Sequence, residues 1–410
     1  MVFPWRRWSL RWCRRRRTGA AIGSPHPDWR LASPNSMLTL SCSGHASWAV
    51  GRGMQRCAAV LVNYHGAHDI AQAVRSIALD DAACEVLVVD NSADAAEFSR
   101  LAEMLPSSVR LIDAKANLGF GQACNLAWQA TQAPFVFFVN PDVRLQPGCI
   151  SALQAALEED ARLAAVSPRQ FLDTACVWHM PPAWLPTALR AWTHEVALRQ
   201  PAAAKRLAQA QRTENLRLWS AGQPVAQRAL SGGALMLRRS ALAKGVLPFD
   251  PRFFMYFEDS DLCLRLRRQG MRMAVVPKAQ AVHAWRNLPH KAPLMERGAQ
   301  VFFDKHWPAP QRRWLDKAAA LGPVPAHPGG WIHRSCSESS IPVPLHWQNA
   351  WLLELSPSPL IQPAAGMLGT GASATVPQEV RNSFCGAPMF GRLSALPLQN
   401  VSTALWLRWD

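Results

Sequence analysis

Short apolar runs alternate with amphipathic stretches through the first half of the chain, beginning near Cys57. The runs contain four or five residues, and the stretches between them repeat their apolar positions with the spacing of one helical face. Strands that alternate with helices in this way predict βαβ units and a mostly parallel sheet, which is an α/β fold class. The predicted strands are Ala58–Val62, Val86–Val89, Val109–Ile112 and Phe135–Val139, and the predicted helices are Asp69–Ala78, Ala95–Leu105 and Gly121–Thr131.

Fewer regular elements are predicted later in the chain. Pro147–Ala165 has a helical pattern with Pro in its first turn, a position where Pro is favoured. A glycine turn leads into an apolar strand over Leu230–Leu237, and further strands are expected at Met273–Val276 and Ala281–His283. Residues 171–230 are irregular and rich in Trp, Pro, Ala, Gln and Arg, so we expect helices and loops that cover the edge of the sheet.

Polar residues stand at the points where the predicted strands end. Asn63 ends the first strand, Asp90 the second and Asp113 the third, and Asn-Pro-Asp at 140–142 follows the fourth. Open α/β sheets bind ligands at the carboxyl ends of their strands. We therefore expect these residues to gather at a binding site.

The stretch from Phe253 to Cys263 places three carboxylates directly after five large apolar side chains. Carboxylates in an apolar setting must be paired, bind a metal or shift their pKa. Leu264–Gly270 predicts a basic amphipathic helix closed by Gly, so Glu258, Asp259 and Asp261 lie at a helix N-terminus, where the helix dipole favours negative charge. This stretch alone leaves two interpretations open, a capped helix and a chemically active acid cluster.

Both ends of the chain differ in composition from its middle. Residues 1–53 carry nine Arg, no Lys and one Asp, and they show no helical or strand period, which predicts a disordered basic extension. Met54 directly precedes the first strand, so we interpret it as the natural start and the preceding segment as a mis-annotated extension. Residues 323–410 contain no Lys and are rich in Pro, Ser and Leu, which predicts a mostly disordered tail. One domain over 54–322 remains, and we expect a protein limited to it to fold and stay active.

Cysteine usage and hydropathy bear on the compartment. The ten Cys residues include no CxxC pair, and several lie in apolar runs, which is typical of a reduced cytosolic protein. The sequence has no run of 18 apolar residues, and no apolar segment follows the N-terminal arginines. We therefore expect a cytoplasmic protein.

Nine short motifs, in order, resemble those of the family 2 glycosyltransferases, in particular rhamnosyltransferase-like members. The resemblance covers about residues 54–310. Its motifs are Val62–Gly66, Val88–Ser92, Asn117–Gly121, Asn125, Val139–Asp142, Gly232–Ala234, Phe249-Asp250, Phe257–Leu262 and Pro277–His283.

The resemblance implies a GT-A fold, a nucleotide-binding α/β sandwich with an acceptor half. It also implies sugar transfer from a nucleoside diphosphate to a glycan or lipid-linked acceptor hydroxyl, with inversion, as in cell-surface polysaccharide synthesis. Asp259 matches the general base, with Glu258 as the second candidate, because the acceptor hydroxyl must lose a proton. Asp261 is interpreted as a helix cap or as the partner of Arg265.

A divalent cation, Mn²⁺ or Mg²⁺, is implied as cofactor because the diphosphate leaves with negative charge. Asp142 matches the metal position, although Asn140 replaces the first acid of the Asp-X-Asp motif found in many relatives. His283 matches a metal-ligand histidine, although Ala284-Trp285-Arg286 follows it where the family often has small residues and a Ser. A strand-end turn for Asp142 and a structural role for His283 are the alternatives.

The remaining matched residues surround the expected nucleotide-sugar site. Asp90 matches the acid that contacts the nucleoside, while Asn63 and Tyr64 match the loop that borders the base. Asn117 and two glycines match the loop near the diphosphate, which opens a helix whose N-terminus suits phosphate. The glycines matched to the diphosphate loop and to the turn beside the sugars are Gly119, Gly121 and Gly233.

Two other functions are weighed against transfer, and a membrane contact is considered beside it. The high pI and the 18 Trp suggest a nucleic-acid-binding protein, but no such motif appears and we expect no nucleic-acid partner. A catalytically inactive nucleotide-sugar-binding protein is compatible with the altered motif at 140–142. The basic and aromatic region Arg297–Leu321 suggests peripheral contact with the inner face of the plasma membrane, with packing against the domain as the alternative.

Overall fold

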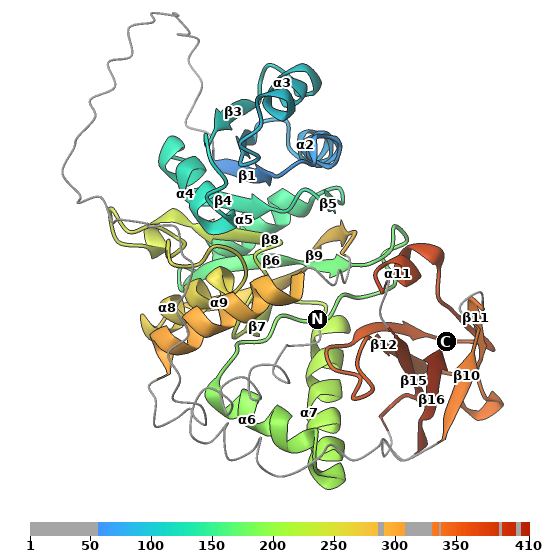
Figure 1. Cartoon of the computed structure of the whole chain (residues 1–410). Helices are drawn as coiled ribbons and strands as arrows, with labels where there is room; N and C mark the ends of the chain where they lie inside the picture. The colour runs from blue at the N-terminus through green and yellow to red at the C-terminus, as the bar shows by residue number, and fades with distance from the viewer. Residues whose placement is uncertain (1–55, 286–290, 308–329, 336–337, 385–387, 399–402) are drawn as a thin grey trace, which may run out of the picture.

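The computed structural model of the chain describes residues 56–285, 291–307, 330–335, 338–384, 388–398 and 403–410. The segment 1–53, Met54 as a start and the boundary at Gly322 lie outside these residues. Figure 1 shows an α/β part with a central sheet, a helical part formed by α6 and α7, and a second sheet formed by the end of the chain.

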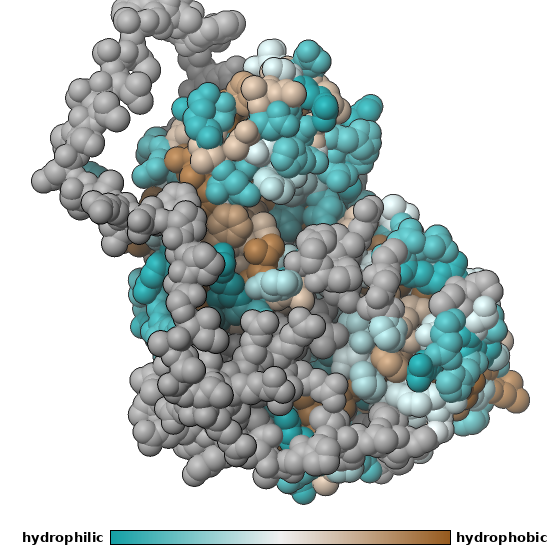
Figure 2. Space-filling model, viewed as in Figure 1, coloured by the Kyte–Doolittle hydropathy of each residue, from teal (hydrophilic) through white to brown (hydrophobic). Residues whose placement is uncertain are grey.

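The N-terminal half consists of the expected βαβ units. Their elements are β1 Cys57–Asn63, α2 Ala67–Asp80, β2 Glu85–Asp90, α3 Ala95–Met104, β3 Arg110–Asp113, α4 Phe120–Ala130 and β4 Phe135–Val139. Helix α2 presents one apolar stripe to the sheet, in which Ile70, Val74 and Ile77 are buried. Hydrophilic residues predominate on the outer surface around α2 and α3 (Figure 2).

The central sheet has nine strands in the order β3-β2-β1-β4-β8-β6-β9-β5, with β7 paired to β9. Its later strands and the helices between them are β5 Val143–Leu145, α5 Cys149–Glu159, β6 Leu163–Phe171, β7 Val225–Gln227, β8 Ala234–Arg238, α8 Glu258–Arg268, β9 Arg272–His283 and α9 Lys291–His306. Strands β8, β5 and β7 run against the other six, so the expected mostly parallel sheet is confirmed.

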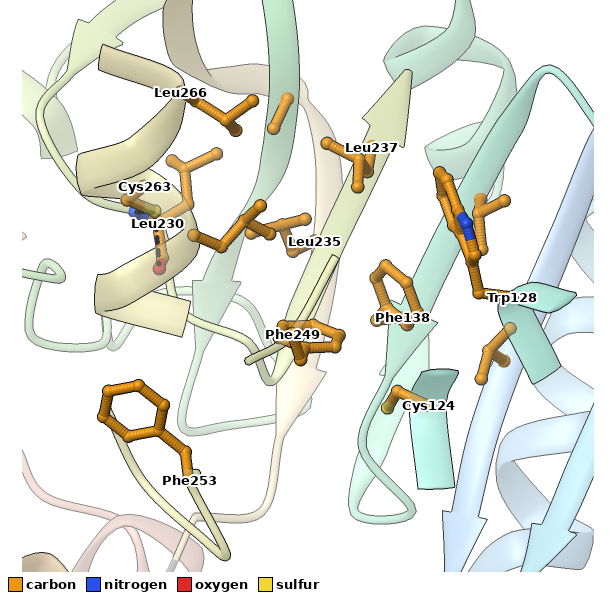
Figure 3. Packing of buried hydrophobic residues seen from close by; sticks show 14 of the residues in the cluster. Cys124, Trp128, Phe138, Leu230, Leu235, Leu237, Phe249, Phe253, Cys263 and Leu266 are labelled. Carbon is orange, nitrogen blue, oxygen red and sulfur yellow. Dashed lines mark hydrogen bonds between the residues drawn. The ribbon is translucent and has the colours of Figure 1, made fainter. Parts of the chain in front are cut away.

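Both faces of this sheet are covered, because alternate side chains of β1 enter different cores. Ala58 and Val60 belong to a cluster with α4, α8 and α9, whereas Ala59 and Leu61 belong to a cluster with α2 and α5. Figure 3 shows the first cluster, in which Leu235 of β8 lies between α8 and β4. This packing fixes the start of α8 beside the turn that leads into β8.

Two predicted elements have different bounds in the structure. The helix expected to reach Ala165 ends at Glu159, and Leu163–Val166 belong to strand β6 instead. Asp160 is extended and ends the helix, and a short buried apolar run does not by itself distinguish helix from strand. The two late strands form one strand, β9, interrupted by a shift in its register with β6.

The prediction that residues 323–410 form a mostly disordered tail is wrong for the part of the tail that the structure describes. A five-stranded sheet has the order β10-β16-β15-β12-β13, and β11 pairs with β14. The elements are β10 Trp331–Arg334, β11 Ser340–Pro342, β12 Trp351–Ser356, β13 Ala365–Gly369, β14 Ser373–Thr375, α11 Gln378–Asn382, β15 Met389–Ala395 and β16 Leu405–Trp409.

This C-terminal sheet is packed against the rest of the chain. Its core includes Leu172 and Trp178, and the Trp178 indole donates a hydrogen bond to the Thr375 carbonyl over 3.1 Å. A Cβ on Gly366 would lie 2.1 Å from the Trp219 ring, so the two surfaces are in close contact. The expected independence of 54–322 therefore does not follow, because removing the sheet would expose these side chains.

Helix α9 contains the first part of the region predicted to contact a membrane. Phe302 and Phe303 are fully buried in the core shared with α8, so they pack against the domain and do not face lipid. Trp314 and Leu315 lie outside the described residues. Within the described part of the chain, no helix is both long and apolar enough to span a bilayer.

Candidate active site

The carboxyl ends of β1 and β2 are joined by a buried hydrogen-bond network. The Asn63 side-chain amide donates to Asp90 over 2.9 Å and to Glu97 over 3.1 Å. Asp90 also accepts from the backbone and hydroxyl of Ser92. Asp90 is only 1% exposed, so in this structure it orders the loop after β2, while Tyr64 beside it is 56% exposed.

Glu97 is a member of this network that the sequence did not indicate. It lies in the first turn of α3, is 2% exposed, and accepts from Asn63 and from the backbone N–H of Ala67. An acid in a first helical turn is ordinarily a solvated residue that complements the helix dipole. Nothing in the sequence around Glu97 distinguishes it from that common case.

The loop before α4 is held by Asn117 and by its glycines. Asn117 accepts from the side chain of Asn91 and from the backbone N–H of Gly119, over 3.0 and 3.1 Å. Gly119 has φ +80°, and a Cβ there would lie 2.0 Å from the Phe254 carbonyl oxygen. A side chain is therefore excluded at Gly119 by both conformation and space. Gly121 packs against the Cβ atoms of Phe249 and Glu258.

The loop before α8, whose first turn contains the acids, enters the helix through two strained residues. Tyr256 and Phe257 have φ of 68° and 69°, a left-handed conformation that costs free energy in residues other than Gly. Such strain is found at functional sites, where the surrounding structure enforces it. Here it ends immediately before Glu258 and Asp259.

Glu258 and Asp259 are adjacent in sequence but differ in environment. Asp259 is partly exposed and accepts from the backbone N–H of Gly232 over 2.9 Å and of Ser260 over 2.6 Å. Burial raises the pKa of Asp259 above its ordinary value, although these hydrogen bonds oppose the rise. Glu258 is 6% exposed, and one of its oxygens has no hydrogen-bond partner among the described residues. Burial, followed by the charge of Asp259, raises the pKa of Glu258 to about 8.

Asp261 has a different role from the two acids before it. It is fully buried and contacts Arg265 over 2.8 Å, Lys305 over 2.5 Å and His306 over 2.7 Å. The predicted pairing with Arg265 is thus confirmed. Asp261 links α8 to α9, and the positive charges of its partners compensate its negative charge.

Asp142 and His283 lie together where β5 pairs with the end of β9. His283 Nε2 is 3.2 Å from Asp142 Oδ1, and His283 Nδ1 is 2.8 Å from Gln170 Oε1. Burial acts to raise the pKa of Asp142, but the charges of His283 and Lys291 and the His283 hydrogen bond outweigh it, lowering that pKa to about 2. Gly233 is required beside this pair, because a Cβ there would lie 2.7 Å from the His283 ring.

The predicted residues therefore form two groups. Gly232 and Gly233 connect Asp259 with the Asp142–His283 pair, since Gly232 contacts Asp259 and Gly233 contacts His283. Asn63, Asp90 and Asn117 form the second group at the ends of β1 and β2. The described residues contain no cluster of three or more His, Cys, Asp or Glu side chains that could enclose a metal ion.

A cavity of about 220 Å³ opens beside Asp259 and His283. Its wall includes Trp184 and Trp219 from the helical part, Trp285 after β9, and Pro363 from the C-terminal part. Asp259 thus lines a half-open cavity whose wall is rich in aromatic residues and proline. Sequence inspection did not indicate these wall residues, because they come from segments far apart along the chain.

Comparisons with known proteins show which family the chain belongs to. The profile of the Glycosyl transferase family 2 matches residues 59–205. The chain is 33% identical over 261 residues to the N-acetylglucosaminyl-diphospho-decaprenol L-rhamnosyltransferase of Mycobacterium tuberculosis, covering 58% of this chain and 81% of that protein. A shorter match, 47% identical over 51 residues, covers 12% of this chain and 19% of the rhamnosyltransferase WbbL of Escherichia coli.

Among solved structures, a mannosyltransferase of Pyrobaculum calidifontis in complex with GDP-Man and Mn²⁺ gives a TM-score of 0.41 at 16% identity, covering 67% of this chain and 73% of the other. The match to the family profile and the extent of the match to the mycobacterial protein identify the family of this chain. It is a glycosyltransferase that belongs to family 2, and its mostly parallel central sheet has the GT-A fold of that family.

Proposed function

We propose that the chain transfers L-rhamnose, with inversion, from a nucleoside diphosphate to a sugar hydroxyl of a lipid-diphosphate-linked acceptor in cell-surface polysaccharide synthesis. The rhamnose and the acceptor are those in the name of the mycobacterial relative, N-acetylglucosaminyl-diphospho-decaprenol L-rhamnosyltransferase. The observation that carries the proposal is the position of Asp259. Its carboxylate faces the cavity and is connected through the Gly232-Gly233 turn to the Asp142–His283 pair.

Asp259 acts as the general base in this proposal. In one displacement the acceptor oxygen forms a bond to the anomeric carbon while the bond from that carbon to the diphosphate breaks. Asp259 accepts the hydroxyl proton, and the diphosphate leaves with the electron pair of the broken bond. Glu258 suits this role less, because a carboxyl with a pKa of about 8 is mostly protonated at neutral pH and cannot accept a proton.

The Asp142–His283 pair has the chemistry of a divalent-cation site. Because Gln170 Oε1 only accepts hydrogen bonds, it holds the proton of His283 on Nδ1 and leaves Nε2 toward Asp142. With His283 neutral, the Nε2 lone pair and the Asp142 carboxylate would hold a divalent cation, and without a cation a protonated His283 donates to Asp142 over the observed 3.2 Å. Mn²⁺ or Mg²⁺ held by Asp142 and His283 would neutralise charge on the leaving diphosphate.

The nucleotide-binding part of the proposal rests on the second group of residues. Asn63, Tyr64 and Asp90 border the nucleoside, and Asn117 orders the loop for the diphosphate. The N-terminus of α4 follows Gly119 directly, and backbone N–H groups at a helix N-terminus favour phosphate. Gly121 allows α4 to lie close to Glu258.

Replacing Asp142 by Ala is expected to weaken Mn²⁺ binding and to raise the KM for the donor by at least about tenfold. Gln170→Ala is expected to weaken Mn²⁺ binding by roughly 10–100-fold, since partners that orient a metal-ligating His have effects of this size. Calorimetric titration of Mn²⁺ in the presence of nucleoside diphosphate, with donor kinetics, measures both changes. Asp160→Ala is the control, because Asp160 binds Arg162 and Arg272 away from the site. Unchanged wild-type activity in EDTA would contradict the metal assignment.

A further inference from the structure

The cavity beside Asp259 adjoins a second and larger cavity. The second cavity has a volume of about 730 Å³, within the range of ligand pockets. It lies against α6 Ala188–Ala197 and α7 Pro201–Trp219. Trp184, Pro186, Gln227 and Pro363 line both cavities, so the two spaces share one wall. A molecule whose end lies beside Asp259 can therefore continue past this wall toward the helices.

Two arginines in the wall of the second cavity have no carboxylate at ion-pair distance among the described residues. They are Arg190 on α6 and Arg228 after β7. A third arginine in this wall, Arg217, is neutralised by Glu214, which accepts from it over 2.7 and 2.9 Å. The wall thus holds three guanidinium groups and the carboxylate of Glu214, whose charge also acts on Arg190 and Arg228. This excess of positive charge favours an anionic ligand, because guanidinium forms strong paired hydrogen bonds with phosphate.

Arg190 is held in place and is close enough to Arg228 for their charges to interact. Its guanidinium stacks on the Trp184 ring with 3.8 Å between the charge centre and the ring centroid. Burial, followed by the charge of Arg228, lowers the pKa of Arg190 to about 10. The charge of Glu214 offsets part of this repulsion, and a bound dianion would offset it further. Trp184 also lines the cavity of Asp259, so the arginines adjoin the site of transfer.

The same wall also carries apolar side chains. Leu189 of α6 is 60% exposed, and the partly exposed Leu198 and Leu207 line the same cavity. Asp259 and Trp184 line the first cavity, and Trp184, the two arginines and these leucines line the second. An amphiphile with a sugar, a diphosphate and a hydrocarbon chain carries groups that match these two sets of side chains.

We propose that the second cavity binds the diphosphate and the first hydrocarbon units of an isoprenoid-diphosphate-linked sugar, with Arg190 and Arg228 as the diphosphate ligands. This assignment rests on the proposed function for the identity of the acceptor. The attached sugar then lies beside Asp259, and Trp184 lies at the junction. Such a site would favour a lipid-linked sugar over a free one as acceptor.

Binding tests the site without turnover. Farnesyl diphosphate is titrated calorimetrically into the full-length protein with Mn²⁺ and saturating thymidine diphosphate, which occupies the donor site. The double variant Arg190→Gln, Arg228→Gln is expected to bind it at least about tenfold more weakly, as the loss of one charge-assisted hydrogen bond implies. Farnesol binding is expected to stay unchanged. Arg206→Gln, on an exposed residue of α7 outside the cavity wall, is expected to match wild type.

Kinetics separate this inference from the proposed function. With farnesyl-diphospho-N-acetylglucosamine, the double variant is expected to raise the acceptor KM at least about tenfold, whereas octyl N-acetylglucosaminide is expected to give wild-type values. Equal farnesyl diphosphate affinity in wild type and double variant overturns the site, as does an equal loss with both acceptors. If no sugar is transferred to any acceptor while the arginines still govern farnesyl diphosphate binding, the proposed function fails and the site stands.

Discussion

Asp259→Asn is expected to reduce kcat by roughly 10²–10⁴-fold, the usual contribution of a general base. The amide keeps the shape of the carboxylate, and its oxygen can still accept from the Gly232 N–H. It cannot accept the proton of the acceptor hydroxyl. Donor affinity is expected to change little. Asp259 contacts the Gly232-Gly233 turn and lines the cavity beside His283, whereas the expected donor site lies at the loop of Asn117.

Glu258→Gln is the matched comparison for this variant. Gln resembles the protonated form of Glu258, which predominates at neutral pH when the pKa is about 8. We therefore expect Glu258→Gln to retain most of the activity. Transfer kinetics and calorimetric donor affinity are measured for both variants. An active Asp259→Asn beside an inactive Glu258→Gln would show that the two roles are reversed.

Glu354→Ala is expected to destabilise the protein by about 3–5 kcal/mol, the cost of leaving buried charges unpaired. Glu354 on β12 is fully buried, with the Arg392 guanidinium bound to both of its oxygens over 2.8 Å. Arg212 of α7 lies 2.8 Å from the same carboxylate. Burial lowers the pKa of Arg212 to about 10, with the charges of Glu354 and Arg392 acting in opposite directions. The single carboxylate thus compensates two buried cations.

This group joins the helical part to the C-terminal sheet, as the position of α7 beside β12 and β15 illustrates (Figure 1). Loss of Glu354 is therefore expected to loosen the contact between the C-terminal sheet and α7. Pro363 and Trp219, which come from these two parts, line the cavity beside Asp259. Urea unfolding gives the change in stability. Glu338→Gln is the control, because Glu338 forms an exposed pair with Arg334. Wild-type stability of Glu354→Ala would mean that the sheet is not attached through this group.

The N-terminal half of the fold was predictable because its information is local. Strands β1 and β2 are buried apolar runs, each followed by a helix, and the helix after β1 turns Ile70, Val74 and Ile77 toward the sheet. Parallel pairing then brings the strand ends together, so Asn63 and Asp90 meet as expected. Periodicity and turn residues are sufficient for this kind of element.

The C-terminal sheet was not predictable from the same signals. Strands β12 and β15 pair although more than 30 residues separate their ends, so the pairing leaves no local pattern. The strand Trp351–Ser356 contains Glu354, which the sequence presents as a surface charge, while the structure neutralises it with two arginines. A composition rich in Pro and Ser then favoured disorder.

The candidate site was predictable where the family resemblance marked its residues. Asp142, His283, Gly233 and Asp259 were found in this way, and the structure brings them together. Gln170 was not found, because its role depends on the register between β6 and β9. The cavity walls depend on how the helical part packs, which no short motif encodes.

Rhamnose transfer can be measured directly. The full-length protein is incubated with Mn²⁺, thymidine diphosphate L-rhamnose and farnesyl-diphospho-N-acetylglucosamine, and the product is analysed by mass spectrometry and by NMR of its anomeric proton. We expect addition of one deoxyhexose with the anomeric configuration opposite to that of the donor, at a rate roughly 10²–10⁴-fold lower with Asp259→Asn. A product that retains the donor configuration, or no transfer from any nucleoside diphosphate sugar, would show that the protein is not an inverting rhamnosyltransferase.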